Sequence, residues 1–97
     1  MSEKYTRVQD ALSAGQTPSM KVFGHSMTPI IKSGTLLTFQ RFDEYEVGDI
    51  VFCRCKGKFL DAHKITKKDN GRYMISNNHG WDNGWTRTIY GKVIKIG

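Results

Sequence analysis

The sequence is poor in the features that mark membrane-spanning and secreted proteins. Its 97 residues include only two cysteines and two prolines, and the uninterrupted apolar runs reach about four residues at most. A transmembrane helix needs about 20 apolar residues in a row, so none is predicted. The N-terminus lacks the charged and then apolar pattern of a secretory signal. We therefore expect a soluble protein that stays inside the cell or inside a particle, with reduced thiols.

Charge of one sign is not gathered in any part of the chain. The sequence has 15 Lys and Arg against 9 Asp and Glu, a formal net charge of +6, yet the longest basic run is Lys67-Lys68. A positive net charge favours contact with acidic partners such as nucleic acids. Because the basic residues are scattered, we interpret them mainly as a solvated surface, with weak nucleic-acid contact as the minor alternative.

Metal-ligand spacing is also missing. The residues that could bind zinc are Cys53, Cys55, His25, His63 and His79. Their spacing matches none of the paired patterns of zinc sites. We expect neither a metal nor a cofactor.

The length allows one domain with a modest core. Tyr5, Val8 and Leu12 are spaced by three and by four residues, which predicts a short amphipathic helix over residues 3–13. We assign residues 1–19 to this helix and a linker, and residues 20–97 to the main domain.

The rest of the chain has the pattern of short strands separated by turns. Turn signals such as Asn70-Gly71 recur every eight to twelve residues or so, which is typical of a small all-β fold. We predict a mainly β protein: a coiled antiparallel sheet or partly open barrel with a short N-terminal helix. The predicted strands are residues 20–23, 35–42, 50–55, 58–67, 72–76 and 88–96, and residues 77–84 are predicted to be a Gly/Asn-rich loop.

Ser26 stands in the turn that follows the first predicted strand. The apolar run Val22-Phe23 ends at Gly24, and Pro29 and Gly34 close the segment. A turn of this kind can expose a serine hydroxyl to a substrate and to a base, as a nucleophile requires. The alternative is a structural turn in which Ser26 caps free backbone N–H groups.

The predicted strand 58–67 carries two residues that could act as the base for Ser26. Alternation places Asp61 and His63 on one face and Lys64 on the other. A neutral imidazole can accept a proton near neutral pH without help, whereas a lysine must first be desolvated. His63 is therefore the better candidate, and a half-buried structural histidine is the alternative.

Four segments resemble the boxes of signal peptidase and LexA-like serine peptidases. They are Val22-Phe23-Gly24-His25-Ser26-Met27, then Tyr45 to Phe52 with its Val47-Gly48-Asp49-Ile50-Val51 core, then Ala62-His63-Lys64-Ile65, and finally Asn77 to Ile94 with its Asn83-Gly84-Trp85-Thr86 ending. These boxes occur in the order of that superfamily and cover residues 20–96. The chain is most similar to its small bacterial and phage members.

The resemblance implies roles for individual residues. Ser26 would be the nucleophile and His63 the general base, as in the histidine-type members, and Lys64 falls on the arginine beside the base. Gly24 and Met27 flank Ser26 and are the expected oxyanion and substrate contacts. Asp82 lies near the place of a third, orienting carboxylate, and Asp61 is its rival.

Some positions differ from the superfamily pattern. Gly24 stands where bacterial signal peptidases have a serine that helps hold the oxyanion, so the Ser26 backbone N–H would carry more of that role. Asn78 replaces the usual aspartate of the last box. Ala14-Gly15 is similar to the bond that LexA-like proteins cleave in themselves. Trp81 and Trp85 are expected to pin the Gly-rich loop onto the core more readily than to line a substrate cleft or a base-stacking platform.

We therefore expect a small soluble serine endopeptidase that works through an acyl-enzyme on a polypeptide substrate, with a small residue before the cut. The alternative is a catalytically inactive module of the same fold that binds a protein partner or nucleic acid. No membrane contact is expected. The expected compartment is the cytoplasm of a bacterial or phage-infected cell, or a phage particle.

Overall fold

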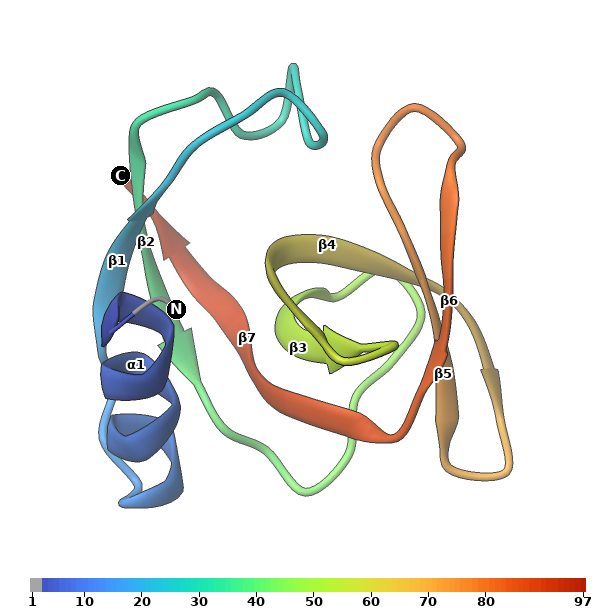
Figure 1. Cartoon of the computed structure of the whole chain (residues 1–97), viewed down its shortest axis with the longest axis horizontal. Coiled ribbons are helices and arrows are strands. Elements are labelled where there is room, and N and C mark those ends of the chain that lie inside the picture. Colours follow the sequence, from blue (N-terminus) through green and yellow to red (C-terminus); the bar gives the residue numbers. More distant parts are fainter. Residues whose placement is uncertain (1–2) are drawn as a thin grey trace.

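The computed structural model describes residues 3–97 and contains one helix followed by seven strands (Figure 1). The strands form one sheet in the order β1-β2-β7-β3-β4-β5-β6, and every neighbouring pair is antiparallel. The sheet curls into a half-barrel, which confirms the predicted mainly β fold. The elements are α1 Glu3–Ser13, β1 Ser19–Val22, β2 Thr35–Gln40, β3 Ile50–Cys55, β4 Lys58–Asp69, β5 Arg72–Ser76, β6 Asp82–Thr86 and β7 Thr88–Ile96.

The helix α1 lies against one side of the sheet and has the bounds predicted from the sequence. Its apolar stripe buries Val8 and Leu12 completely or nearly so in the same core as residues of β1 and β2. Gly91 of β7 allows this close approach, because a Cβ there would lie 2.9 Å from the Gln40 carbonyl oxygen and 3.0 Å from Leu12 Cδ2. The helix is therefore part of the packed fold, and the division at residue 19 stays a prediction.

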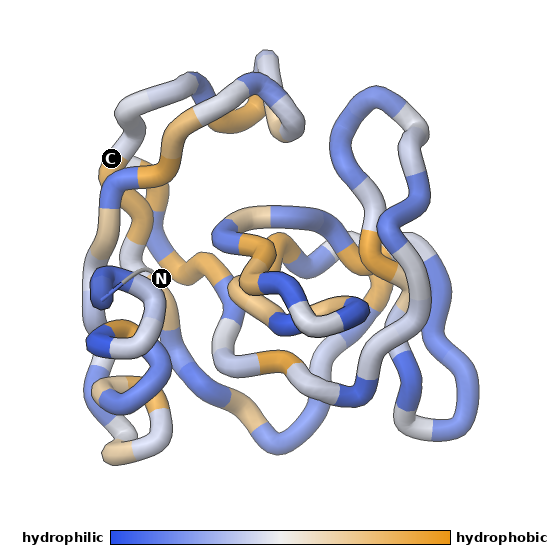
Figure 2. Tube along the Cα trace, viewed as in Figure 1, coloured by the Kyte–Doolittle hydropathy of each residue, from blue (hydrophilic) through white to orange (hydrophobic). Residues whose placement is uncertain are grey.

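Two groups of buried side chains form the core. Figure 2 shows hydrophobic segments along the strands and hydrophilic residues in most of the loops. The first group joins α1 to β1, β2 and the Ser26 turn, and the second lies under β3, β4 and β5. The first contains Val8, Leu12, Met20, Val22, Met27, Ile31, Leu37, Phe39, Phe52 and Ala62, and the second contains Tyr45, Val51, Cys53, Ile65, Tyr73 and Ile75.

The strand bounds agree closely with the prediction except at β6. The sequence predicts no strand at Asp82–Thr86 and assigns its first three residues to a loop, yet the segment pairs with β5 from Ser76↔Asp82 to Tyr73↔Thr86. Its Asn and Gly residues have low β propensity. Pairing with a neighbouring strand overrides that weak preference.

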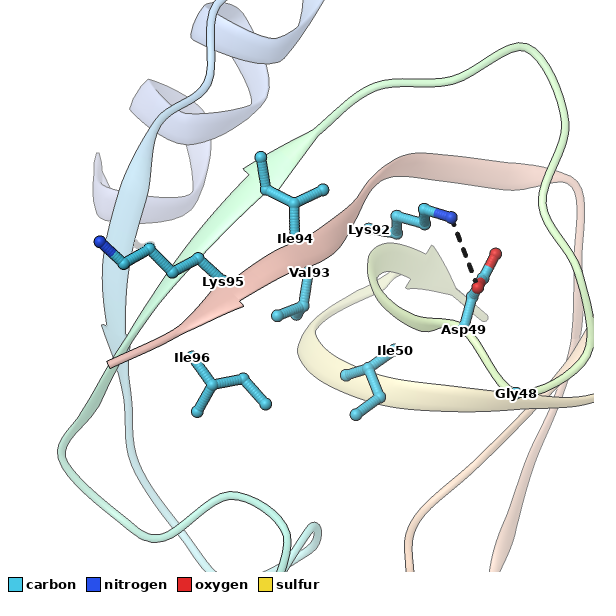
Figure 3. Close-up of a pocket in the computed structure, with 8 residues that line it drawn as sticks. All are labelled: Gly48, Asp49, Ile50, Lys92, Val93, Ile94, Lys95 and Ile96. Atoms are coloured by element: carbon cyan, nitrogen blue, oxygen red, sulfur yellow. Dashed lines mark ion pairs between the residues drawn. The ribbon is translucent and has the colours of Figure 1, made fainter.

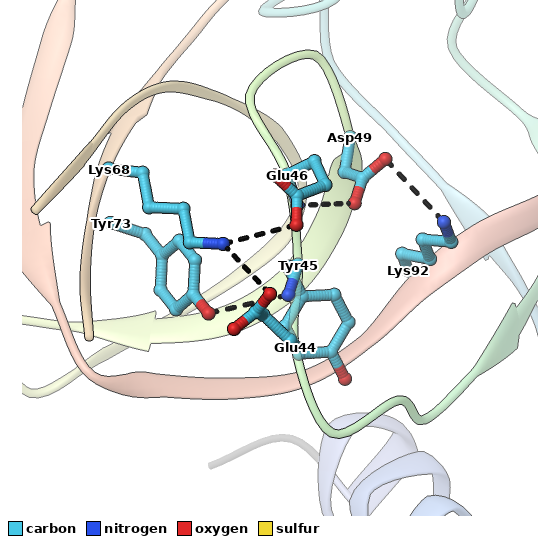
Figure 4. Close-up of polar contacts among 7 residues, drawn as sticks. All are labelled: Glu44, Tyr45, Glu46, Asp49, Lys68, Tyr73 and Lys92. Carbon is cyan, nitrogen blue, oxygen red and sulfur yellow. Dashed lines mark hydrogen bonds and ion pairs between the residues drawn. The ribbon is translucent and has the colours of Figure 1, made fainter.

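A polar network fixes the loop between β2 and β3 (Figure 4). The Lys68 ammonium lies 3.3 Å from a Glu44 carboxylate oxygen and 3.1 Å from one of Glu46. The Tyr45 backbone N–H donates to the Tyr73 hydroxyl, and Tyr45 itself is buried. The loop therefore enters β3 at a defined position, which matters because β3 pairs with the strand that carries His63.

No helix among residues 3–97 is long and apolar enough to cross a membrane. Cys53 and Cys55 are both buried as free thiols, and burial raises the pKa of Cys53 to about 12.

Candidate functional site

Ser26 lies on a compact turn between β1 and β2. Gly24 has a φ of +107°, a backbone conformation that side chains rarely adopt, and it turns the chain out of β1. The Gly34 N–H donates to the Val22 carbonyl oxygen at 2.7 Å, and the Ile31 N–H donates to that of Met27 at 2.9 Å. The segment is therefore a closed series of turns. Ser26 is half-buried on it.

The loop between β5 and β6 holds this turn in place, and the two loops meet at the top of Figure 1. The Asn78 backbone N–H donates to the Ser26 carbonyl oxygen at 2.7 Å. The Asn78 side-chain amide donates to the Thr28 carbonyl oxygen at 2.9 Å. His79 Nε2 lies 2.8 Å from the His25 carbonyl oxygen, which can only accept, so this nitrogen carries the proton. Asn78 is thus the main link between the two loops.

A narrow crevice runs beside Ser26 between its turn and β4. Its walls are formed by Val22, Phe23, Gly24, Ser26, Met27, Ile31, Asp61 and Ala62. Its volume is about 10 Å³, close to the minimum that one water molecule needs. The structure therefore brings Ser26 to the strand that carries the two candidate bases.

His63 is buried on β4 with 8% of its surface exposed. Burial lowers the pKa of His63, against the opposing effects of the Asp61 charge and of the Ala62 backbone carbonyl, both of which favour the protonated ring. Its Nδ1 atom is buried and has no hydrogen-bond partner within residues 3–97. The imidazole is therefore neutral at pH 7 and retains an unused polar atom.

The neighbouring Lys64 points to the other face of β4, as the alternation predicted. His63 lies opposite Val51 of β3, and Lys64 lies opposite Ile50; opposite residues of an antiparallel pair share a face. Lys64 Nζ lies 3.4 Å from Asn78 Oδ1, so its ammonium reaches the residue that holds the Ser26 turn. Within the described chain, no hydrogen bond joins Ser26 Oγ to either candidate base.

The two candidate orienting carboxylates have different partners. Asp61 accepts from the Tyr5 hydroxyl at 3.2 Å and from the Ala62 N–H at 2.9 Å, and its charge acts on His63. Asp82 accepts from the hydroxyl of Ser76 at 2.6 Å. Ser76 is buried and lies opposite Lys64 in the β4–β5 register. Asp61 is thus on the His63 side of the site and Asp82 on the Lys64 side.

The two residues that flank Ser26 also line the crevice. The Gly24 N–H donates to the Ser33 hydroxyl at 3.1 Å, so it is already engaged and is not free for an oxyanion. Met27 is buried in the first core group, with 3% of its surface exposed, and forms part of the crevice wall. A substrate could therefore contact the Met27 side chain only where that side chain lines the crevice.

Other predicted positions lie outside the crevice. Trp81 is 69% exposed, so the expectation that it packs on the core was wrong. The Asn77 side chain fixes this loop instead, by accepting hydrogen bonds from the backbone N–H groups of His79 and Trp81. Trp85 is half-buried with the Arg72 guanidinium 4.7 Å from its ring centre. Ala14 and Gly15 form the turn that ends α1.

A wider hollow of about 440 Å³ lies at the end of β7 (Figure 3). Ile50, Val93 and Ile96 gather around it, and an ion pair of 3.6 Å between Lys92 and Asp49 closes one side. None of the residues that line it is a serine, cysteine or histidine. It therefore offers apolar surface without a hydroxyl, thiol or imidazole nucleophile.

Two site residues were not identified from the sequence. In the sequence, Asn78 stands out only as a departure from the superfamily pattern, and Tyr5 only as part of the apolar stripe of the helix. The available signal for Asn78 was its place in the last superfamily box. Nothing in the pattern of α1 indicated that the Tyr5 hydroxyl reaches Asp61.

Comparison with known families gives one match. The model of the family described as Peptidase S24-like matches residues 2–94, almost the whole chain and α1 with it. A search of curated proteins found no match.

Proposed function

Because the chain belongs to the Peptidase S24-like family and is therefore a peptidase-like module, we propose that it hydrolyses peptide bonds with Ser26 as the nucleophile. The observation that carries this proposal is the position of Ser26. It lies half-buried on a turn held by Asn78 and faces a crevice against the strand of His63. A positioned hydroxyl next to a potential base is the minimum that acyl transfer requires.

We propose His63 as the general base. Its neutral imidazole can accept the Ser26 proton, since burial keeps its pKa below the ordinary value. Hydrogen bonds of this kind often tighten only when a substrate binds, so their absence between Ser26 and His63 is compatible with the role. Lys64 is the competing base, because its ammonium reaches Asn78 beside the same turn.

The proposed reaction has two steps. Ser26 Oγ attacks the peptide carbonyl carbon while His63 takes its proton, and His63 then gives this proton to the leaving amine, which leaves an acyl-enzyme. A water molecule, deprotonated by His63, then releases the acid and restores Ser26. The Ser26 backbone N–H would stabilise the oxyanion, since the Gly24 N–H donates to Ser33.

Labelling with a fluorophosphonate probe tests the proposal. The experiment compares wild type with Ser26→Ala, His63→Gln and Lys64→Met between acid and alkaline pH. We expect wild type to be labelled at Ser26, Ser26→Ala not to be labelled, and His63→Gln to be labelled at least about a hundredfold more slowly. A large loss in Lys64→Met with labelling retained in His63→Gln would make Lys64 the base.

The same measurement bears on the alternative of an inactive module. If no variant and no wild-type sample is labelled at any pH, Ser26 is not activated and the hydrolase proposal is wrong. A module of this fold that binds a protein partner or nucleic acid would then be the remaining hypothesis. Nucleic-acid binding would weaken steeply with added salt, and protein binding need not.

A further inference from the structure

Asp61 is the only charged residue among those that line the crevice in the described chain. The other wall residues are apolar, glycine or Ser26 itself. A single carboxylate in an otherwise uncharged wall is not needed for packing, since burying it costs free energy unless it is well bonded. Its surroundings indicate what it can bind.

Neutral donors are the only hydrogen-bond partners of Asp61 within residues 3–97. They are the Tyr5 hydroxyl and the Ala62 N–H, one on each carboxylate oxygen. No lysine or arginine of this part of the chain lies within 4.0 Å of the carboxylate. A carboxylate offers about four acceptor positions, so room remains on both oxygens. Burial, together with the Asp61 charge, raises the pKa of Tyr5 to about 12, so the phenol stays a neutral donor.

Phe23 forms the neighbouring part of the crevice wall and is 65% exposed. The Lys4 ammonium lies 5.2 Å from its ring centre and donates to the Lys21 carbonyl oxygen at 2.9 Å. The ring face therefore already accommodates an ammonium group, as aromatic faces do. The Asp61 carboxylate has no ion-pair partner among the described residues and can bind the charged head of a lysine or arginine. The exposed Phe23 ring can pack against the apolar stem of the same side chain.

We propose that this crevice selects polypeptides with a basic side chain near the bond that Ser26 attacks, recognised by Asp61 and Phe23. The inference rests on the proposed function. The crevice itself has room for about one water molecule, so it cannot hold a long side chain at the attacked position. Side chains two residues apart in an extended polypeptide point the same way, so the basic residue is placed two positions before the attacked one.

Two tripeptide probes that end in a reactive alanine phosphonate test this specificity. One carries lysine two residues before the reacting alanine, and the other carries norleucine, which lacks the charge. We expect wild type to react about tenfold to a hundredfold faster with the lysine probe. Asp61→Asn should bring the ratio of the two rates close to one. Asp69→Asn, which makes the same change of charge in the exposed β4–β5 turn, should leave the ratio unchanged.

A binding experiment separates this inference from the hydrolase proposal. Acetyl-Lys-Ala-Ala-amide and its norleucine counterpart are titrated into Ser26→Ala and followed by NMR at the amides of Phe23 and Asp61. Preference for the lysine peptide without any labelling of wild type would overturn the hydrolase proposal and support the basic specificity. Equal rates and equal binding for the two side chains, or a preference that survives Asp61→Asn, would overturn the specificity.

Discussion

The backbone N–H of Asn78 lies 2.7 Å from the carbonyl oxygen of Ser26 and joins the β5–β6 loop to the turn of the candidate nucleophile. The same residue uses its side chain to bind Thr28 and to accept from Lys64. Three contacts from one half-buried asparagine give the Ser26 turn a fixed position relative to β4. Its removal should therefore affect both stability and reactivity.

Asn78→Ala removes the two side-chain contacts and keeps the backbone one. We expect the free energy of unfolding to fall by about 1–2 kcal/mol, measured by urea denaturation. Fluorophosphonate labelling of Ser26 should slow as well, because the turn is less well positioned. The exposed Thr88→Ala serves as the control. Unchanged stability together with unchanged labelling would show that the loop contact does not position Ser26.

His63 should make the protein less stable in acid. Burial lowers its pKa in the folded state, whereas the unfolded chain titrates near 6.5. As the pH falls below about 6.5, the unfolded state takes up a proton that the folded state resists, so stability is lost with a slope of at most about 1.4 kcal/mol per pH unit.

Urea denaturation between pH 7.5 and pH 5 measures this effect. His63→Gln should flatten the dependence of the unfolding free energy on pH, and His25→Gln, at an exposed position, serves as the matched control. An equal slope in wild type and His63→Gln would show that His63 is not the group responsible.

Tyr5 should titrate late and lose its contribution to stability in strong alkali. Its pKa is raised to about 12 in the folded state, first by burial and then by the Asp61 charge. A raised folded pKa means that the stabilisation is complete below about pH 10, the ordinary value, and is lost as the pH rises toward 12. Phenolate absorbance during alkaline titration should lose one late step in Tyr5→Phe. If the step that is missing from the Tyr5→Phe titration instead lies near pH 10, the ordinary tyrosine value, this assignment is contradicted.

Gly91→Ala should destabilise the docking of α1. A Cβ at this position would lie 2.9 Å from the backbone oxygen of Gln40 and 3.0 Å from Leu12 Cδ2. Overpacking of this kind costs about 1–3 kcal/mol, and the backbone oxygen cannot move away as a flexible side chain could. Urea denaturation gives the free energy of unfolding, and a variant as stable as wild type would show that β2 and α1 adjust freely.

Most of the fold could be predicted because its signals are local. The helix over residues 3–13 follows from apolar spacing, and the β4–β5 turn follows from Asn70-Gly71, both of which have positive φ. β6 was missed because Asn83 and Gly84 give no strand signal, and only their pairing with β5 creates the strand.

The site was predictable as a list of residues and not as a set of contacts. Ser26 and His63 stand out by their types and by the boxes around them. Nothing local shows that Asn78, 52 positions after Ser26 in the chain, binds its carbonyl oxygen. The bond from Tyr5 to Asp61 likewise spans 56 positions, and such contacts come from the curl of the sheet.

The position of α1 has a practical consequence for any fusion protein. Its first turn carries Lys4 and Tyr5, which touch Phe23 and Asp61 of the crevice wall. An affinity tag or reporter joined ahead of residue 3 would therefore sit at the mouth of the candidate site and could screen it from peptides. A tag joined after Gly97, whose N–H donates to the Leu36 carbonyl oxygen, would instead begin at the end of β7 where that strand meets β2.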